Sequence, residues 1–177
     1  MNEHIVVPSN IPEADLVALL QVCQLEPQNE RPKGLGYPGI TLKDDSFIIP
    51  TVREIADRAV QEAGWSLDYH WSTLAGSGVN FLHYSMGDRL GPHVDKPLHG
   101  DDLVHTADSE VKLTVVMNLS SDCDGGKFAF IDSESGHREM VDLPVGHALV
   151  YQASESYTQV TEVTSGELFQ LAAFFIA

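Results

Sequence analysis

The chain has 177 residues, of which 43% are hydrophobic and 20% are charged, a composition typical of a globular protein. Lys and Arg number 10 against 26 Asp and Glu, which gives a formal net charge of −16. That charge argues against nucleic-acid binding, because phosphate contacts require Lys and Arg, and against docking on anionic membranes.

The first part of the chain, 1–78, predicts one strand and two helices. Residues 4–7 are expected to form a short strand. Pro12 suits the first turn of a helix. The apolar stripe of that helix consists of Leu16, Leu19, Leu20 and Cys23. Residues 29–46 are polar and rich in Gly and Pro, which predicts a loop with at most one short strand.

A second helix is expected to start at Thr51 and to end at Gly64. Thr51 and Glu54 have the spacing of a capping box, in which each side chain satisfies a backbone N–H at the start of a helix. Apolar residues at helical spacing follow, and a glycine suits the residue just after a helix.

Beyond residue 64 the hydrophobic period changes to that of strands. Trp65, Leu67, Tyr69 and Trp71 alternate with polar residues. Strand-like runs separated by turn residues follow at 79–84, 111–119, 127–131, 138–142, 147–151, 158–163 and 167–176. Many short strands at such spacing predict an all-β sandwich or a jelly roll. We therefore expect a single domain over 1–177, mainly β (α+β), with a β core over 79–177 and two N-terminal helices that buttress one sheet.

Membrane segments, targeting signals and cysteines indicate the cellular compartment in which a protein works. The sequence contains no run of about 18 apolar residues, so we expect no transmembrane helix. Residues 1–10 lack the basic and apolar segments of a secretory signal. Cys23 and Cys123 are too few and too far apart for a disulfide framework or a CxxC metal site. We therefore expect free thiols in a cytoplasmic protein.

The motif that carries chemistry is His93-Val94-Asp95. Residues two positions apart in an extended segment point the same way, so this imidazole and carboxylate can hold one divalent metal ion. With a distant second His, His-x-Asp forms the facial triad of non-haem Fe(II) oxygenases, which leaves positions open for a cosubstrate and O₂. Alone, the motif is weak evidence, because a surface histidine beside an unrelated aspartate more often gives the same pattern by chance.

Further motifs surround this one in a fixed order. They are FLHY (81–84) with Gly87, HVDKP (93–97), KLTVVMNLS (112–120), DGGKF (124–128), LPVGHALVY (143–151) and VTEVTSG (160–166). In these motifs the chain resembles the Fe(II)/2-oxoglutarate dioxygenase superfamily, and within it the prolyl-4-hydroxylases and PKHD-type hydroxylases. The resemblance implies that the core over 79–177 is a double-stranded β-helix, a cupin-like jelly roll, and that an Fe(II) site has His93 and Asp95 as ligands. It also implies an oxidation that consumes O₂ and 2-oxoglutarate.

Three positions depart from the pattern that the resemblance implies. The second metal-binding His falls on Thr158, the cation that pairs with the 2-oxoglutarate carboxylate falls on Leu168, and a cosubstrate-contacting Tyr falls on Leu90. Threonine is a poor Fe(II) ligand, and leucine cannot neutralise a buried carboxylate. The three changes suggest a pocket with a new purpose, whereas the retained His93 and Asp95 argue for a metal.

Other residues are candidates for the missing roles. Glu155, just before Thr158, is a substitute ligand, and His99 and His105 would extend the pair to a His-rich cluster that also suits Zn²⁺. Lys112 is a candidate cation. Gln170, which shares strand parity with Leu168, is a candidate hydrogen-bond donor, and Tyr84 belongs to the same pocket. Each residue type is also common as an ordinary surface or sheet-edge group.

Three functions remain open at this point. The first is an iron-dependent oxygenase that hydroxylates or otherwise oxidises a small molecule, with altered or absent 2-oxoglutarate dependence. The second is a metal-dependent jelly-roll enzyme that does not use 2-oxoglutarate, in which Leu90 and Leu168 help to admit the substrate itself. The third is a catalytically inactive binding or partner protein. The short chain favours a small-molecule substrate over a protein, and it leaves open whether a homo-oligomer forms.

Overall fold

Strands dominate the part of the chain that the computed structural model describes, namely residues 3–25, 39–41, 48–69, 79–95, 110–120 and 122–176. The helices are α1 (Glu13–Leu25) and α2 (Ile48–Ala63). The strands are β1 (His4–Pro8), β2 (Gly39–Thr41), β3 (Val79–Tyr84), β4 (Leu90–His93), β5 (Val111–Asn118), β6 (Cys123–Gly125), β7 (Phe128–Ile131), β8 (Arg138–Val141), β9 (His147–Gln152), β10 (Thr158–Val160), β11 (Val163–Gly166) and β12 (Leu168–Ile176).

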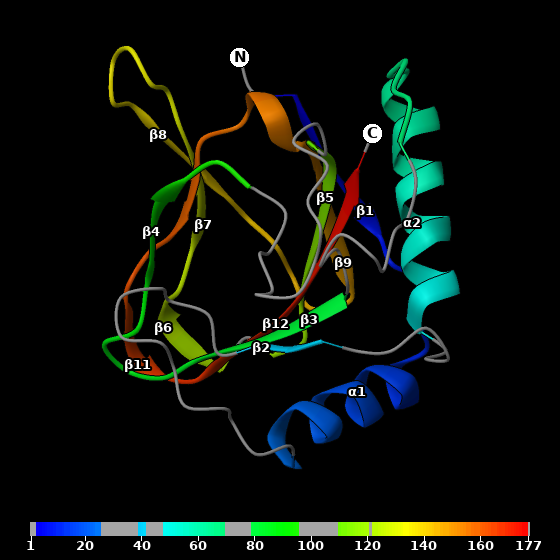
Figure 1. The fold of residues 1–177 in the computed structure, drawn as a ribbon. Coiled ribbons are helices and arrows are strands. Elements are labelled where there is room, and N and C mark those ends of the chain that lie inside the picture. Colours follow the sequence, from blue (N-terminus) through cyan, green and yellow to red (C-terminus); the bar gives the residue numbers. More distant parts are fainter. Residues whose placement is uncertain are drawn as a thin grey trace, which may run out of the picture.

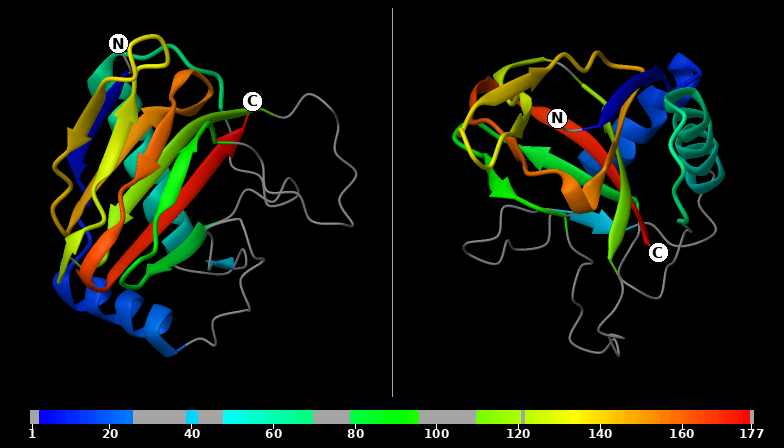
Figure 2. Two further views of the ribbon diagram at one scale, coloured as in Figure 1. Left: turned by 90° about the vertical axis from the view of Figure 1, so that its left-hand side faces the viewer. Right: turned by 90° about the horizontal axis from the view of Figure 1, so that it is seen from above.

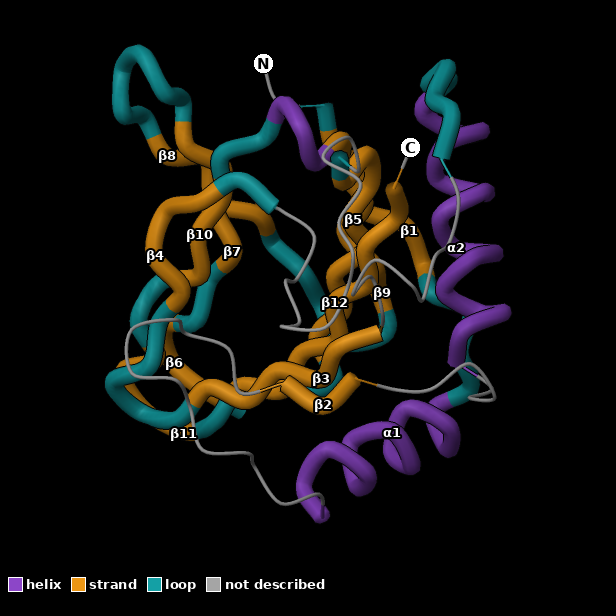
Figure 3. Tube along the Cα trace, viewed as in Figure 1, coloured by secondary structure: helices purple, strands orange, loops and turns teal. Residues whose placement is uncertain are grey.

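Two antiparallel sheets face each other, as a jelly roll requires (Figures 1 and 3). The larger sheet has the order β1-β9-β5-β12-β3-β2 and the smaller one the order β4-β10-β7-β8. A further pair, β11-β6, lies near the ends of β12 and β3 (Figure 1). Seen from above in Figure 2, α2 covers the outer face of the larger sheet, and the smaller sheet lies on the opposite side. The two helices therefore buttress one sheet, as predicted.

The strand β12 lies at the centre of the larger sheet and is buried on both faces. Its alternate residues from Phe169 to Phe175 pack with side chains of α1 and α2 in one apolar cluster. The residues between them face the smaller sheet and belong to an inner apolar cluster, apart from the polar Gln170. The neighbouring β5 follows the same alternation, so that Thr114 and Val116 also point inward. The space between the sheets is therefore lined largely by apolar groups.

The start of α2 differs from the prediction. The helix begins at Ile48, so Thr51 lies inside it and the predicted capping box is wrong. Pro50 stands in the first turn, where its missing N–H removes no helical hydrogen bond, and the buried Ile48 and Ile49 anchor this turn on the core. Gly64 follows the helix with a φ of 69°, and the predicted end is confirmed.

The strands predicted from period-two runs are present, with two differences in the second half of the chain. The run 158–163 divides into β10 and the start of β11, and the short strands β4, β6 and β11 were not predicted. Among the described residues, the alternating Trp65, Leu67 and Tyr69 form no strand, and their side chains pack on the outer apolar cluster. Trp71 lies outside the described residues.

Neither α1 nor α2, the helices of the described ranges, has the length and apolar character needed to cross a membrane. Cys23 on α1 and Cys123 on β6 are free thiols, as expected. Burial raises the pKa of Cys23 to about 12, which leaves this thiol protonated and unreactive at neutral pH.

The tight contact between β6 and the segment before β11 gives a first prediction. Gly125 and Gly136 have φ values of 75° and 70°, but only at Gly125 would a Cβ collide with a backbone atom, the carbonyl oxygen of Glu162. Gly136→Ala should cost about 1–2 kcal/mol of folding free energy, for the left-handed backbone alone. Gly125→Ala should cost clearly more in urea unfolding. Equal losses would contradict the close approach of the two segments.

Candidate metal site and cavity

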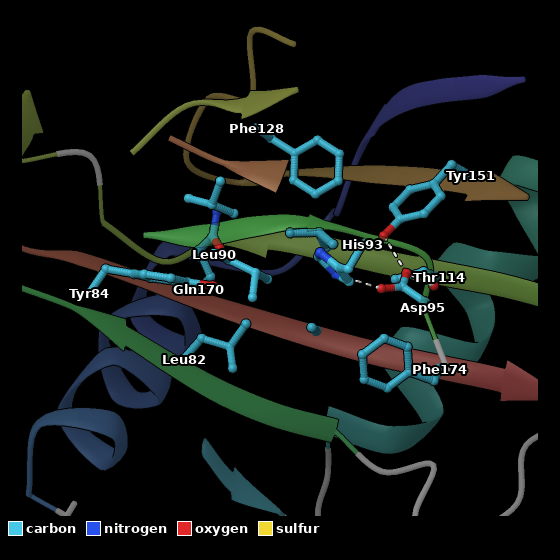
Figure 4. Close-up of a pocket in the computed structure, with 13 residues that line it drawn as sticks. Leu82, Tyr84, Leu90, His93, Asp95, Thr114, Phe128, Tyr151, Gln170 and Phe174 are labelled. Atoms are coloured by element: carbon cyan, nitrogen blue, oxygen red, sulfur yellow. Dashed lines mark hydrogen bonds and ion pairs between the residues drawn. The ribbon is translucent and has the colours of Figure 1, made fainter. Parts of the chain in front are cut away.

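His93 and Asp95 meet at the end of β4, where both face the interior between the sheets (Figure 4). Nε2 of His93 lies 3.1 Å from Oδ1 of Asp95, and Nδ1 of His93 lies 2.8 Å from the carbonyl oxygen of Gly91. A carbonyl only accepts, so Nδ1 carries hydrogen and Nε2 is the atom turned to Asp95. Two neighbouring ligand atoms of an octahedral ion, at bonds of about 2.1 Å, lie roughly 3.0 Å apart. The pair therefore fits two coordination positions of a divalent metal.

The carboxylate of Asp95 is buried and is held in place by two hydroxyl groups. Oδ2 accepts hydrogen bonds from Oγ1 of Thr114 at 2.8 Å and from the phenol of Tyr151 at 2.5 Å. These bonds occupy Oδ2 and leave Oδ1 facing His93, an orienting role often seen around metal ligands. Neither Thr114 nor Tyr151 is among the site residues predicted from the sequence. No local pattern marks either residue, because each reaches Asp95 from a strand that is distant in the sequence.

The imidazole of His93 is affected by opposing influences. Burial lowers its pKa, whereas the hydrogen bond and charge of Asp95 raise it, assisted by the backbone carbonyls of Gly91 and Thr158. The raising influences together prevail, so the pKa of His93 lies above its usual value. The two side chains thus hold a proton between them more strongly than an isolated imidazole would.

Thr158 stands where the second metal-binding histidine was expected. It is the cross-strand partner of His93 between the antiparallel β10 and β4, and its side chain is fully buried. Within the described ranges its Oγ1 has no hydrogen-bond partner. These residues also include no group of three or more His, Cys, Asp or Glu that could hold a metal. The described chain thus offers two ligands and a buried, unsatisfied hydroxyl beside them.

A cavity that is partly open to solvent extends from the His93–Asp95 pair between the two sheets. Its polar lining consists of Tyr84, His93, Asp95, Thr114, Tyr151 and Gln170, and its apolar lining consists of Leu82, Leu90, Val116, Phe128, Val160, Ala172 and Phe174. Of the described residues, no lysine or arginine lines it. A dicarboxylate would therefore find no cation among these groups.

The structure places the other predicted site residues as follows. Tyr84, Leu90 and Gln170 line the cavity together with His93 and Asp95. Leu168 is buried in the inner cluster, packed over Gly126, and is not part of the lining. Lys112 does not line the cavity, and its Nζ pairs with Oε2 of Glu110 at 2.5 Å. Glu155 is exposed in the 3₁₀ turn Ala153–Glu155. His99 and His105 lie outside the described residues.

Sequence comparison finds similarity to PKHD-type hydroxylases. A PKHD-type hydroxylase of Thioalkalivibrio sulfidiphilus is 34% identical over 91 residues, which are 51% of this chain and 39% of the relative. Another, of Paracoccus denitrificans, is 31% identical over 131 residues, which are 72% of this chain and 56% of the relative. The matches thus span about half the length of these relatives or less. No family model matches the chain.

Structure comparison confirms the fold. A prolyl-4-hydroxylase of Pseudomonas putida superposes with a TM-score of 0.68 at 15% identity, over 99% of this chain and 92% of that one. The viral collagen prolyl hydroxylase of Paramecium bursaria Chlorella virus-1 superposes with a TM-score of 0.72 at 12% identity, over 98% of this chain and 96% of that one. The predicted jelly roll and the predicted resemblance to the Fe(II)/2-oxoglutarate dioxygenase superfamily, in its prolyl hydroxylase and PKHD branch, are confirmed.

Proposed function

We propose that this chain is an iron-dependent, oxygenase-like hydroxylase that oxidises a small molecule and makes altered use of 2-oxoglutarate. The observation that carries the proposal is the convergence of Nε2 of His93 and Oδ1 of Asp95, 3.1 Å apart, at a cavity between the two sheets. The similarity to PKHD-type hydroxylases supports the reaction class. The fold contributes a scaffold only, because a jelly roll hosts many functions.

The residues of the cavity have separable roles in this proposal. Fe(II) bound by His93 and Asp95 would supply the activation of O₂ that oxidation of a C–H bond requires. Tyr151 and Thr114 fix the Asp95 carboxylate so that Oδ1 is directed at the metal position. The apolar walls hold the hydrocarbon part of a substrate and exclude water from the reacting groups.

The altered use of 2-oxoglutarate is supported by what surrounds the cavity. Leu90 lines it and Leu168 packs beside it, at the two positions where the resemblance implies contacts with 2-oxoglutarate. A carboxylate buried there without a cation would lose its hydration at a cost of several kcal/mol. A metal enzyme in which the cavity takes the substrate itself is therefore the second candidate function.

Anaerobic calorimetric titration with Fe(II), followed by addition of 2-oxoglutarate under visible spectroscopy, tests the proposal. We expect one Fe(II) per chain, and binding at least tenfold weaker in His93→Ala, because one of the two protein ligands is removed. His137→Ala is the matched control, since His137 is exposed and distant in sequence from the motif. No lysine or arginine is among the described residues that line the cavity. We therefore expect the metal-to-ligand charge-transfer band only at high 2-oxoglutarate concentration.

Two results would contradict the proposal. If the unaltered chain does not bind Fe(II), or if His93→Ala binds it equally well, the pair is not a metal site. The chain would then be better explained as a binding or partner protein that keeps the fold. A strong band at low 2-oxoglutarate concentration would contradict the altered cosubstrate use alone.

A further inference from the structure

We infer that the end of the cavity at Gln170 binds an uncharged hydrogen-bond donor, above all a primary amide, at the far end of a small-molecule ligand. The inference rests on the proposed function only in that it takes this cavity as the binding site. It concerns the ligand class, which neither the fold nor the similarity to hydroxylases specifies.

Gln170 is the polar member of an otherwise apolar row. The inward-facing residues of β12 are Leu168, Gln170, Ala172 and Phe174, and the side chain of Gln170 is only 1% exposed. In Figure 4 it extends into the cavity near Leu90 and Tyr84. A buried amide in such a row is costly unless its hydrogen-bonding groups are used, so its partners determine what it offers a ligand.

A chain of hydrogen bonds fixes which way the Gln170 amide faces. Nδ2 of Asn118 donates to the carbonyl oxygen of Leu143 at 2.8 Å, and a carbonyl only accepts. Oδ1 of Asn118 must then face Gln170, and it accepts from Nε2 of Gln170 at 2.8 Å. Nε2 is thus committed to Asn118, and Oε1 of Gln170 is the group left over. None of the described residues donates a hydrogen bond to that oxygen.

The acceptor oxygen that Gln170 presents to the cavity selects among ligands. An acceptor oxygen repels a carboxylate, and among the lining residues of the described chain no lysine or arginine is present to offset that repulsion. A primary amide instead donates an N–H to Oε1 and can accept from the second N–H of Gln170. A site whose buried polar group is matched by one ligand rejects an analogue that leaves it unmatched. A hydroxyl group can also donate to Oε1, but it makes one hydrogen bond fewer and is the weaker ligand group.

The two ends of the cavity lie far enough apart for an elongated ligand. Gln170 is bonded to Asn118, and Asp95 is bonded to Thr114, four positions along β5. At about 3.3 Å per strand residue, this separation corresponds to about 13 Å between the backbone positions. The side chains shorten the gap, so a ligand with a metal-binding head and an amide tail can extend from one end to the other.

The test compares 2-oxoglutarate with its 5-amide, 2-oxoglutaramate, which differs only at the far end. Anaerobic calorimetry measures both dissociation constants on the Fe(II)-loaded chain and on the metal-free chain. We expect the amide to bind at least tenfold more tightly than the diacid. In Gln170→Leu the ratio should fall to near one while Fe(II) affinity is unchanged. Gln159→Leu is the matched control, because Gln159 is also buried but does not line the cavity.

Several outcomes would overturn the inference. They are equal or tighter binding of the diacid, a ratio that persists in Gln170→Leu, and no binding of either compound with or without iron. The proposed function can fail separately. If Fe(II) does not bind but the metal-free chain still prefers the amide through Gln170, the inference stands and the hydroxylase proposal falls. If Fe(II) binds and the preference is absent, the reverse holds.

Discussion

Replacing Thr158 with histidine should tighten Fe(II) binding by at least about a hundredfold. Thr158 points inward, is fully buried and faces His93 across adjacent antiparallel strands. An imidazole there would stand beside the existing pair and supply the third ligand of a facial triad. Loss of groups that merely orient ligands already costs 10–100-fold in metal affinity, so gain of a ligand should exceed that range. Anaerobic calorimetry with Fe(II) measures the change.

The control for this variant is Thr158→Val, which keeps the side-chain shape and supplies no ligand. Its Fe(II) affinity should equal that of the unaltered chain, and its thermal stability should rise slightly, because a buried hydroxyl without a partner is removed. Thr158→His must also fit a larger ring beside Phe130, which is expected to lower the stability of the metal-free chain. If the histidine and valine variants bind Fe(II) alike, Thr158 does not occupy a ligand position.

Leu168→Arg should destabilise the fold by about 3–5 kcal/mol, the range for a buried charge left without its partner. The Leu168 side chain is 1% exposed, and its Cδ2 packs over Gly126, where even an added Cβ would come within 2.9 Å. A guanidinium there would lose its hydration among apolar groups. The free energy of unfolding in guanidinium chloride measures the loss.

Added 2-oxoglutarate should partly restore the stability of Leu168→Arg, because its carboxylate can neutralise the new cation and a ligand that binds only the folded state stabilises it. Leu168→Met is the control: it preserves volume, should cost less than about 1.5 kcal/mol, and should gain nothing from 2-oxoglutarate. A Leu168→Arg chain as stable as the control would show that the site is not closed and apolar. Equal stabilisation of both variants would show that the cation position lies elsewhere.

Much of the fold was predictable because burial on both faces leaves a clear pattern. Long apolar runs such as those of β5 and β12 predict buried strands, and Gly64 marks the end of α2. The predicted helix omits residues 48–50, because the local capping pattern at Thr51 gives no sign of the tertiary contacts that bury Ile48 and Ile49. The short strand β4 was not predicted, because Gly91 and Pro92 disfavour strands and only pairing with β10 makes the segment extended.

The site was predictable where the chemistry lies in neighbouring residues. His93 and Asp95 are two positions apart, so their convergence follows from an extended backbone. Tyr151 and Thr114 reach Asp95 from β9 and β5, and such long-range contacts leave no local signal. Lys112 shares strand parity with Thr114, but parity does not reveal that its long side chain turns back to Glu110.

The position of β12 bears on how the chain acquires its structure. This strand comes late in the sequence, yet it separates β5 from β3 at the middle of the larger sheet. Until it has been synthesised, β5 and β3 each lack a neighbour, and their open edges can pair with other chains. Folding of the larger sheet must therefore await a distant segment, which predicts slow folding dominated by non-local contacts. It also makes the nascent chain vulnerable to aggregation until β12 has formed.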